Sequence, residues 1–161
     1  MSIPRRRRLA TLFLFFASLF LALPAVAGYR TGPVPGWVQA IGLDLRREAP
    51  ADATGGADYL LTDLQVRHEP GRELAYSRYA TRVLDASGLG QVANIEISFD
   101  PAYQVLTLHS IDVVRDGRRL PRLAGAKVEL LQREQELEAR IFDGRMTAAV
   151  FLTDVRVGDI V

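Results

Sequence analysis

Two histidines are the side chains of this sequence best suited to metal binding or to acid–base chemistry near neutral pH. His68 and His109 are far apart, and no His-x-His or His-x-x-x-His spacing occurs. A metal site would require both rings and several carboxylates to be brought together by the fold. Since His109 lies in a β-prone run with Leu108 and Ile111, we expect it to be hydrogen-bonded in the core or at an interface. We therefore expect neither a metal ion nor a cofactor.

Three charged residues near the C-terminus, Asp154, Arg156 and Asp159, stand close together in the sequence. Such a group could bind a charged ligand. Paired aspartate and arginine side chains in a turn more often hold the turn together through charge-assisted hydrogen bonds. We favour this structural interpretation, because the sequence Val157-Gly158-Asp159 is typical of a turn.

The sequence offers few nucleophiles for covalent catalysis. It contains no cysteine, which excludes a disulfide framework, a thiolate zinc site, a cysteine nucleophile and a lipidated N-terminal cysteine. No serine downstream of residue 27 lies in a Gly-x-Ser-x-Gly motif; these serines are Ser77, Ser87, Ser98 and Ser110. A Gly-rich phosphate-binding loop is also absent from the sequence.

The run from Glu129 to Glu138 holds the densest group of carboxylates, with Glu134, Glu136 and Glu138 at alternate positions. Two nearby carboxylates could serve a glycosidase, but nothing in the sequence aligns a cleft with them. We expect a solvated surface instead. The chain is therefore predicted not to be an enzyme, and a hydrolase that uses His109 with an aspartate or glutamate is the least favoured alternative.

Aromatic side chains provide the other candidate binding residues. Trp37 lies in a segment rich in glycine and proline, where an isolated tryptophan more often anchors the segment to a domain than stacks on a ligand. A glycan- or peptide-binding module could use exposed Trp37, Tyr59, Tyr76 or Tyr79. This binding role is the main alternative to a purely accessory role.

The first 27 residues have the three-part layout of a secretory signal peptide. Four arginines, Arg5 to Arg8, precede an uncharged apolar run from Leu9 to Leu23, and Pro24 and Ala25-Val26-Ala27 follow. The run is about 15 residues long, short of the roughly 20 that span a bilayer. We predict cleavage after Ala27 and a periplasmic or secreted product. The alternative is an uncleaved signal that anchors the chain in the inner membrane.

The charge balance argues against a nucleic-acid partner. The whole chain has 20 basic and 19 acidic residues, and without Arg5 to Arg8 the mature part keeps 16 basic residues, a net charge of −3. Nucleic-acid binding requires clustered positive charge. We expect a protein or another component of the cell envelope as partner, and contact with a membrane only through an uncleaved signal.

Residues 28–58, rich in Gly, Pro, Ala and Asp, are expected to form an extended lead-in, and residues 59–161 a β domain. Residue types and alternation predict about seven short strands with turns between them, among them the hairpin signals Asp116-Gly117 and Asp143-Gly144. The predicted strands are 59–68, 74–85, 92–99, 103–115, 118–120, 127–132 and 146–154, with another starting at 160.

This pattern is typical of an all-β, antiparallel β-sandwich-like domain. Residues 132–140 could form a helical turn or two, but no crossover helices separate the strands, so a parallel sheet is not expected. The alternation within 103–115 slips between Leu106/Leu108 and Ile111/Val113, which indicates a bulge or a strand that passes between sheets.

Several motifs in the later half resemble the bacterial domain of unknown function 3857. The resemblance runs from about Tyr59 to the end and rests on Phe99 to Ile111, Arg115-Asp116-Gly117, Glu134 to Glu138, Phe142-Asp143-Gly144 and Leu152 to Val161. It implies a β-sandwich-like fold and no known activity. Such domains commonly precede a transglutaminase-like domain, with a Cys-His-Asp triad, in exported or membrane-attached proteins.

The resemblance implies that relatives continue past the Val-Gly-Asp motif, so this chain is expected to be truncated and its domain incomplete at the C-terminus. We expect Ile160-Val161 to leave a sheet edge with unpaired backbone groups. The favoured function is a non-catalytic accessory or interaction module of an exported cell-envelope protein, which would position a transglutaminase-like domain or its substrate.

Overall fold

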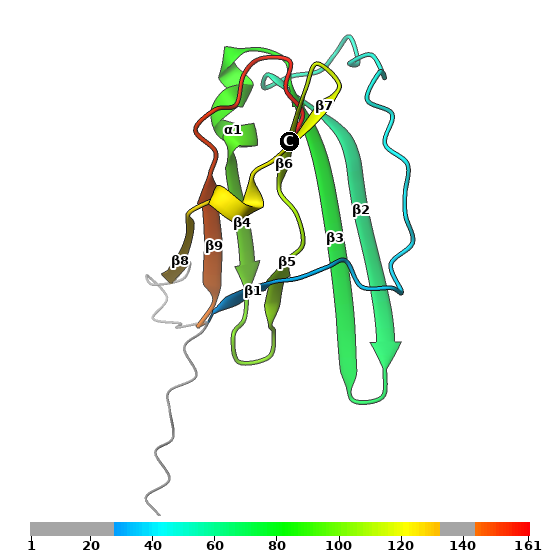
Figure 1. Cartoon of the computed structure of the whole chain (residues 1–161), viewed down its shortest axis with the longest axis vertical. Coiled ribbons are helices and arrows are strands. Elements are labelled where there is room, and N and C mark those ends of the chain that lie inside the picture. The colour runs from blue at the N-terminus through cyan, green and yellow to red at the C-terminus, as the bar shows by residue number, and fades with distance from the viewer. Residues whose placement is uncertain (1–27, 133–143) are drawn as a thin grey trace, which may run out of the picture.

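A computed structural model describes residues 28–132 and 144–161, and these residues form an all-β domain with one short α-helix (Figure 1). The described strands are β1 Tyr29–Thr31, β2 Ala57–Glu69, β3 Arg72–Val83, β4 Asn94–Phe99, β5 Leu106–Leu108, β6 Asp112–Arg115, β7 Arg118–Pro121, β8 Val128–Gln132 and β9 Met146–Phe151. The helix α1 spans Leu89–Ala93 and follows a 3₁₀ turn at Ala86–Gly88. The predicted all-β class is confirmed.

Strands β2 and β3 form a long antiparallel hairpin that closes at Gly71, whose φ of 78° suits glycine. A register shift between Tyr59 and Leu61 places a bulge near the start of β2. Beyond the bulge the expected alternation holds, since Thr62, Leu64 and Val66 share one face and pair with Tyr79, Ser77 and Ala75. The sequence prediction of these two strands is confirmed.

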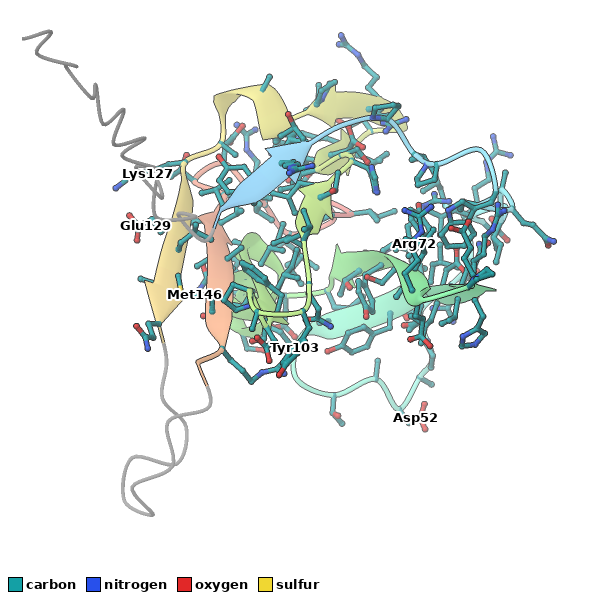
Figure 2. All side chains as sticks on the ribbon, turned by 90° about the horizontal axis from the view of Figure 1, so that it is seen from below. Asp52, Arg72, Tyr103, Lys127, Glu129 and Met146 are labelled. Atoms are coloured by element: carbon teal, nitrogen blue, oxygen red, sulfur yellow. The ribbon has the colours of Figure 1, made fainter. Side chains whose placement is uncertain are left out.

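Strands β4, β9 and β8 form a second antiparallel sheet, in that order. The predicted strand 92–99 is wrong at its start, because residues 89–93 form α1 and the strand begins at Asn94. Val92 is buried from this helix against Ala57 and Val83, so tertiary packing outweighs its β propensity. Figure 2 looks at the molecule from below and places Arg72, at the end of the hairpin, well away from Glu129 of β8 and Met146 of β9.

The predicted strand 103–115 is two strands, β5 and β6, separated at residues 109–111. The slip in its alternation was the correct signal for this break. Asp116-Gly117 closes the β6–β7 hairpin with positive φ at both residues, 51° and 73°, as predicted. The predicted hairpin at Asp143-Gly144 and the predicted helical turn at 132–140 fall almost wholly outside the described residues; Gly144 itself has a φ of 65°.

The lead-in differs from the prediction in two respects. It contains β1, which pairs with β5 in parallel, so the expectation of no parallel pairing is wrong for these two short strands. Strand β2 also begins at Ala57, two residues before the predicted strand start, and Gly56 just before it is packed against Gly88 with no room for a side chain on either. The rest of the lead-in is extended and runs along the β2–β3 hairpin (Figure 1).

The C-terminal residues lie between two hairpins rather than at an open edge. Ile160 bridges Arg82 of β3 on one side and Val114 of β6 on the other, both antiparallel. Val161 exchanges two backbone hydrogen bonds with Thr81, of 2.8 and 2.9 Å, and Ile160 exchanges two with Val114. The expectation that Ile160 and Val161 would have unpaired backbone groups is therefore wrong, because β3 forms hydrogen bonds with Val161 on one side and β6 with Ile160 on the other.

Candidate functional site

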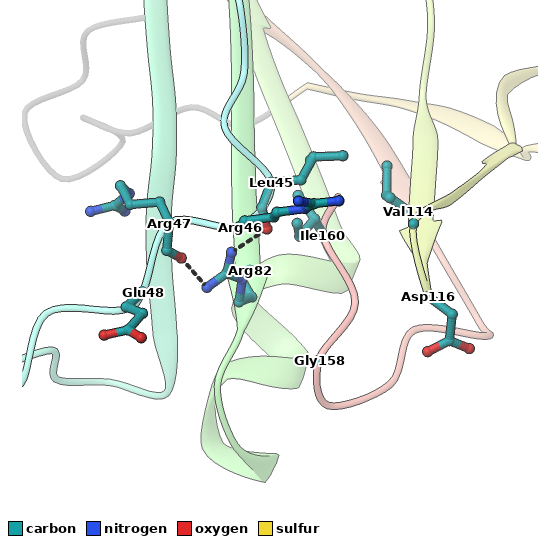
Figure 3. A pocket seen from close by; sticks show the side chains of 10 residues that line it. Leu45, Arg46, Arg47, Glu48, Arg82, Val114, Asp116, Gly158 and Ile160 are labelled. Carbon is teal, nitrogen blue, oxygen red and sulfur yellow. Dashed lines mark hydrogen bonds between the residues drawn. The ribbon is translucent and has the colours of Figure 1, made fainter.

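A cavity of about 650 Å³ lies between the lead-in and the sheet (Figure 3). The side of the cavity formed by the lead-in includes Arg46, Arg47 and Glu48. The side formed by the sheet includes Arg82, Val114 and Ile160. Its lining carries charged side chains, which makes it a candidate catalytic or binding site.

Arg82 and Arg47, two of the arginines that line this cavity, make structural contacts. Arg82 donates hydrogen bonds to the backbone carbonyls of Arg47 and Leu45, at 2.7 and 2.8 Å (Figure 3). Behind it, Asp58 is buried and accepts a hydrogen bond from Arg47 at 2.5 Å, with Arg82 at 3.8 Å. These contacts tie the lead-in to the β2–β3 hairpin. The lining also holds the carboxylates of Glu48 and Asp116.

The charged residues singled out near the C-terminus do meet, and they meet around an arginine that sequence reasoning missed. Arg115, at the end of β6, donates two hydrogen bonds to the carboxylate of Asp159, at 2.9 and 2.7 Å. The same guanidinium contacts Asp154 at its carboxylate and its backbone carbonyl. Asp159 also accepts from the backbone N–H of Arg156 at 2.8 Å, which closes the turn. The predicted turn-holding role is confirmed for Asp159.

The hydrogen bonds in this cluster shift the pKa values of its charged groups. The side chain of Asp159 is only 3% exposed, and hydrogen bonds from Arg115 lower the pKa of its carboxyl group, against the opposing effect of burial. Hydrogen bonds from Arg115 and then Arg156 also lower the pKa of Asp154, and the pKa of Arg115 is raised chiefly by Asp159. All three groups are thus held in their charged forms, which suits an ion pair and not proton transfer.

The two histidines lie in different places. His109 is half-buried, its Nδ1 lies 3.0 Å from the carbonyl oxygen of Gly32, and its ring lies 5.8 Å from that of Tyr76. His68, near the end of the hairpin, is exposed and lies 3.1 Å from Glu73. The hydrogen-bonded role predicted for His109 is confirmed. Within residues 28–132 and 144–161 no group of three or more His, Asp or Glu side chains could hold a metal ion.

The serines and glutamates considered as catalytic groups form no common site. Ser87 donates to Asp85 at the start of the 3₁₀ turn, and Ser98 lies 3.1 Å from Thr147 across the β4–β9 pair. Ser77 and Ser110 are exposed on separate strands or loops. Glu134, Glu136 and Glu138 lie outside the described residues.

The aromatic candidates separate into two groups. Trp37 is half-buried in the lead-in, and Tyr76 faces His109 on the covered side of the hairpin. Tyr59 and Tyr79 instead lie on the opposite face and are 60% and 62% exposed. The strand predicted at 59–68 puts Leu64 and Val66 on one face by alternation, but alternation could not show that this face is open to solvent.

We use the term apolar face for the side of the β2–β3 hairpin that carries Tyr59, Leu64, Val66, Ala75 and Tyr79. Leu64 is 67% exposed and Val66 46%. On the reverse side Asp58 and Asp63 are buried, because the lead-in covers that side and supplies partners. The usual arrangement of apolar residues inside and carboxylates outside is inverted here. Thr62, Ser77 and Thr81 lie on the same face between these residues. Exposed apolar side chains grouped on one face often mark a site of interaction.

Comparisons with known proteins place the chain in a family without defining an activity. In the part of the chain that the structure describes, no helix is long and apolar enough to cross a membrane. Searches among curated proteins and among solved structures returned no match. The model of the family described as a Domain of Unknown Function, DUF3857, matches residues 69–161, more than half of the chain. The chain therefore belongs to the DUF3857 family.

Proposed function

We propose that this protein is a non-catalytic accessory or interaction module of an exported cell-envelope protein, and that it acts beside a transglutaminase-like domain. Its role would be to position that domain or the domain's substrate. The observation that carries the proposal is the apolar face, where Leu64 and Tyr79 are more than half exposed. Leaving such side chains in water costs free energy that contact with a partner would recover, at about 25 cal/mol per Å².

The charged groups support the same proposal. Arg82, Arg115 and their aspartate partners each join segments distant in sequence, so they stabilise a rigid platform. A scaffold held in this way presents its surface in one conformation, which lowers the entropic cost of binding. Export through the leader at residues 1–27 would bring this platform to the cell envelope.

The test is site-specific photo-crosslinking in cells that export the full chain. A photoreactive amino acid at Leu64 probes the apolar face, and one at Arg118, an exposed residue of β7, is the matched control. We expect an adduct from position 64 only, and mass spectrometry should identify its partner as a protein with a transglutaminase-like domain or a substrate of one. Equal adducts from both positions, or none from position 64, would refute the proposal.

A glycan-binding role is the second candidate, and one observation favours it. Tyr59 and Tyr79 are both exposed on the apolar face, and Gln91 donates a hydrogen bond to the hydroxyl of Tyr59. An amide next to an exposed aromatic ring can hold a sugar hydroxyl while the ring stacks on the sugar. Binding of peptidoglycan fragments that is lost in Tyr79→Ala, with the crosslinks from position 64 unchanged, would favour this role.

A further inference from the structure

We propose that the cavity between the lead-in and the sheet binds a short zwitterionic peptide, with a free carboxylate, a free ammonium group and an apolar side chain. This inference goes beyond the proposed function, because a small ligand in the cavity requires neither a transglutaminase-like domain nor contact with the apolar face. The volume of about 650 Å³ lies within the range of about 300–1,000 Å³ that is common for small-molecule sites. Three features of the cavity carry the proposal.

The first feature is Arg46, whose backbone is held in place while its guanidinium group is left without a partner. Arg82 donates hydrogen bonds to the carbonyls of Leu45 and Arg47, the residues on either side of Arg46, at 2.8 and 2.7 Å. The N–H of Arg46 itself bonds the carboxylate of Asp44 at 2.9 Å. Among the described residues, the side chain of Arg46 makes no hydrogen bond or ion pair. The other two arginines of the cavity are bonded as described above, so Arg46 is the cation that remains for a ligand carboxylate.

The second feature is an apolar floor beside this guanidinium. Ile160 lies opposite Arg82 and Val114 in the sheet, so the side chains of all three point to the same face. Leu45 lines the cavity from the lead-in. Figure 3 shows the guanidinium group of Arg46 above Ile160 and directed toward Val114. An apolar side chain of a ligand bound by Arg46 would therefore be removed from water against this floor.

The third feature is the carboxylate of Asp116, in the tight turn that follows β6. Figure 3 shows Asp116 below Val114, and Glu48 on the opposite side of the cavity, beyond Arg82. Neither carboxylate has a hydrogen bond or an ion pair among the residues that the structure describes. These carboxylates would repel a simple anion, and Arg46 would repel a simple cation. The complementary ligand carries both charges with an apolar part between them, its carboxylate at Arg46 and its ammonium group at Asp116.

The cavity extends away from Val161. From the row of sheet residues that forms its floor, it continues toward Gly158 and the turn at Asp116. Ala80 and Asp112 face the same side one step further in the direction of Val161, and neither of them lines the cavity. The groups that would hold the ligand therefore all belong to segments that the structure describes.

The experiment follows binding of the dipeptide leucyl-leucine to the purified chain by nuclear magnetic resonance, through the methyl signals of Val114 and Ile160. Two modified probes test the two charges: leucyl-leucine amide lacks the carboxylate, and N-acetyl-leucyl-leucine lacks the ammonium group. We expect leucyl-leucine to shift both methyl signals in a saturable way. Each modified probe should bind about tenfold more weakly or less well still, as the loss of a charge-assisted hydrogen bond implies.

Two variants assign these charges to residues. Arg46→Gln should weaken the binding of leucyl-leucine about tenfold and remove the difference between leucyl-leucine and its amide. Asp116→Asn should do the same with respect to the acetylated probe, and asparagine tolerates the φ of 51° at this position, so the turn is kept. The matched control is Arg30→Gln, at an exposed arginine outside the cavity whose side chain has no partner among the described residues. It should leave binding unchanged, and circular dichroism checks that all three variants fold.

Three results would overturn the proposal. One is the absence of a saturable shift at Val114 and Ile160. The second is equal affinity for leucyl-leucine and either modified probe, which would make the cavity a site for a simple cation or a simple anion. The third is equal affinity of Arg46→Gln and Arg30→Gln for leucyl-leucine. Crosslinking from position 64 should be the same in Arg46→Gln as in the original chain, so the accessory function can stand where this inference fails, and the reverse.

Discussion

Neutralising Asp159 should destabilise the domain more than neutralising its exposed neighbour on the same arginine. Asp159→Asn keeps the size of the side chain but turns an amide toward Arg115, which donates two hydrogen bonds to the carboxylate at 2.9 and 2.7 Å. It also weakens the bond from the N–H of Arg156. Since the carboxylate is 3% exposed, solvent cannot replace these partners.

The expected loss is about 3 kcal/mol of unfolding free energy, in the range for breaking a buried, hydrogen-bonded ion pair. That is a large part of a typical stability of about 5–15 kcal/mol. The assay is urea unfolding followed by far-ultraviolet circular dichroism. Asp154→Asn is the matched control, because Asp154 bonds the same guanidinium but is 49% exposed, and its loss should be much smaller.

The pH dependence gives an independent readout. The pKa of Asp159 is lowered in the folded state, chiefly by hydrogen bonds from Arg115, so the unfolded state binds protons more readily. The stability from this group is present above the unfolded pKa of about 4 and is lost as the pH falls through the lower, folded pKa. In Asp159→Asn the unfolding free energy should fall less steeply at acid pH. Part of the fall should remain, because the pKa of Asp154 is also lowered in the folded state. Equal losses of unfolding free energy in Asp159→Asn and Asp154→Asn, with the decline in stability at acid pH unchanged in both, would refute this role of the Arg115–Asp159 pair.

Three further predictions address the glycines and the leader. Gly88→Ala should cost about 3 kcal/mol or more, because a Cβ would overlap the backbone of Gly56, and a melting temperature close to that of the original chain would contradict this contact. Gly117→Val should cost about 1–3 kcal/mol by thermal denaturation, since its φ is 73°; an unchanged melting temperature would argue against the hairpin. N-terminal sequencing of exported protein should begin at Gly28, and a sequence that starts at Met1 would show that the leader is retained.

Local signals predicted those parts of the fold that depend on local chemistry. The alternation in β2 and the Asp116-Gly117 turn depend on residues adjacent in sequence, and both were predicted. Helix α1 was not, because Val92 is buried from this helix against Val83 and against Ala57, which is distant in sequence. The parallel pairing of β1 with β5 depends on long-range contacts for the same reason.

The candidate site, too, could be predicted only where its residues are close together in the sequence. Asp154, Arg156 and Asp159 were identified because they are close in sequence, but Arg115, which organises them, lies on another strand. The arginine of an Arg-Asp-Gly hairpin was a signal that could have been weighed, since such a residue lies at a strand end and can reach across a sheet. Which face of β2 is covered could not be predicted from alternation, which gives the period of a strand and not its orientation.

The β2–β3 hairpin buries Asp58 and Asp63 on one face and exposes apolar side chains on the other. The lead-in covers the face with Asp58 and Asp63 because arginine and glutamine side chains there can bond its backbone carbonyls, as Gln65 bonds Gln39. A second apolar layer over Leu64 and Val66 would require a further strand or a partner.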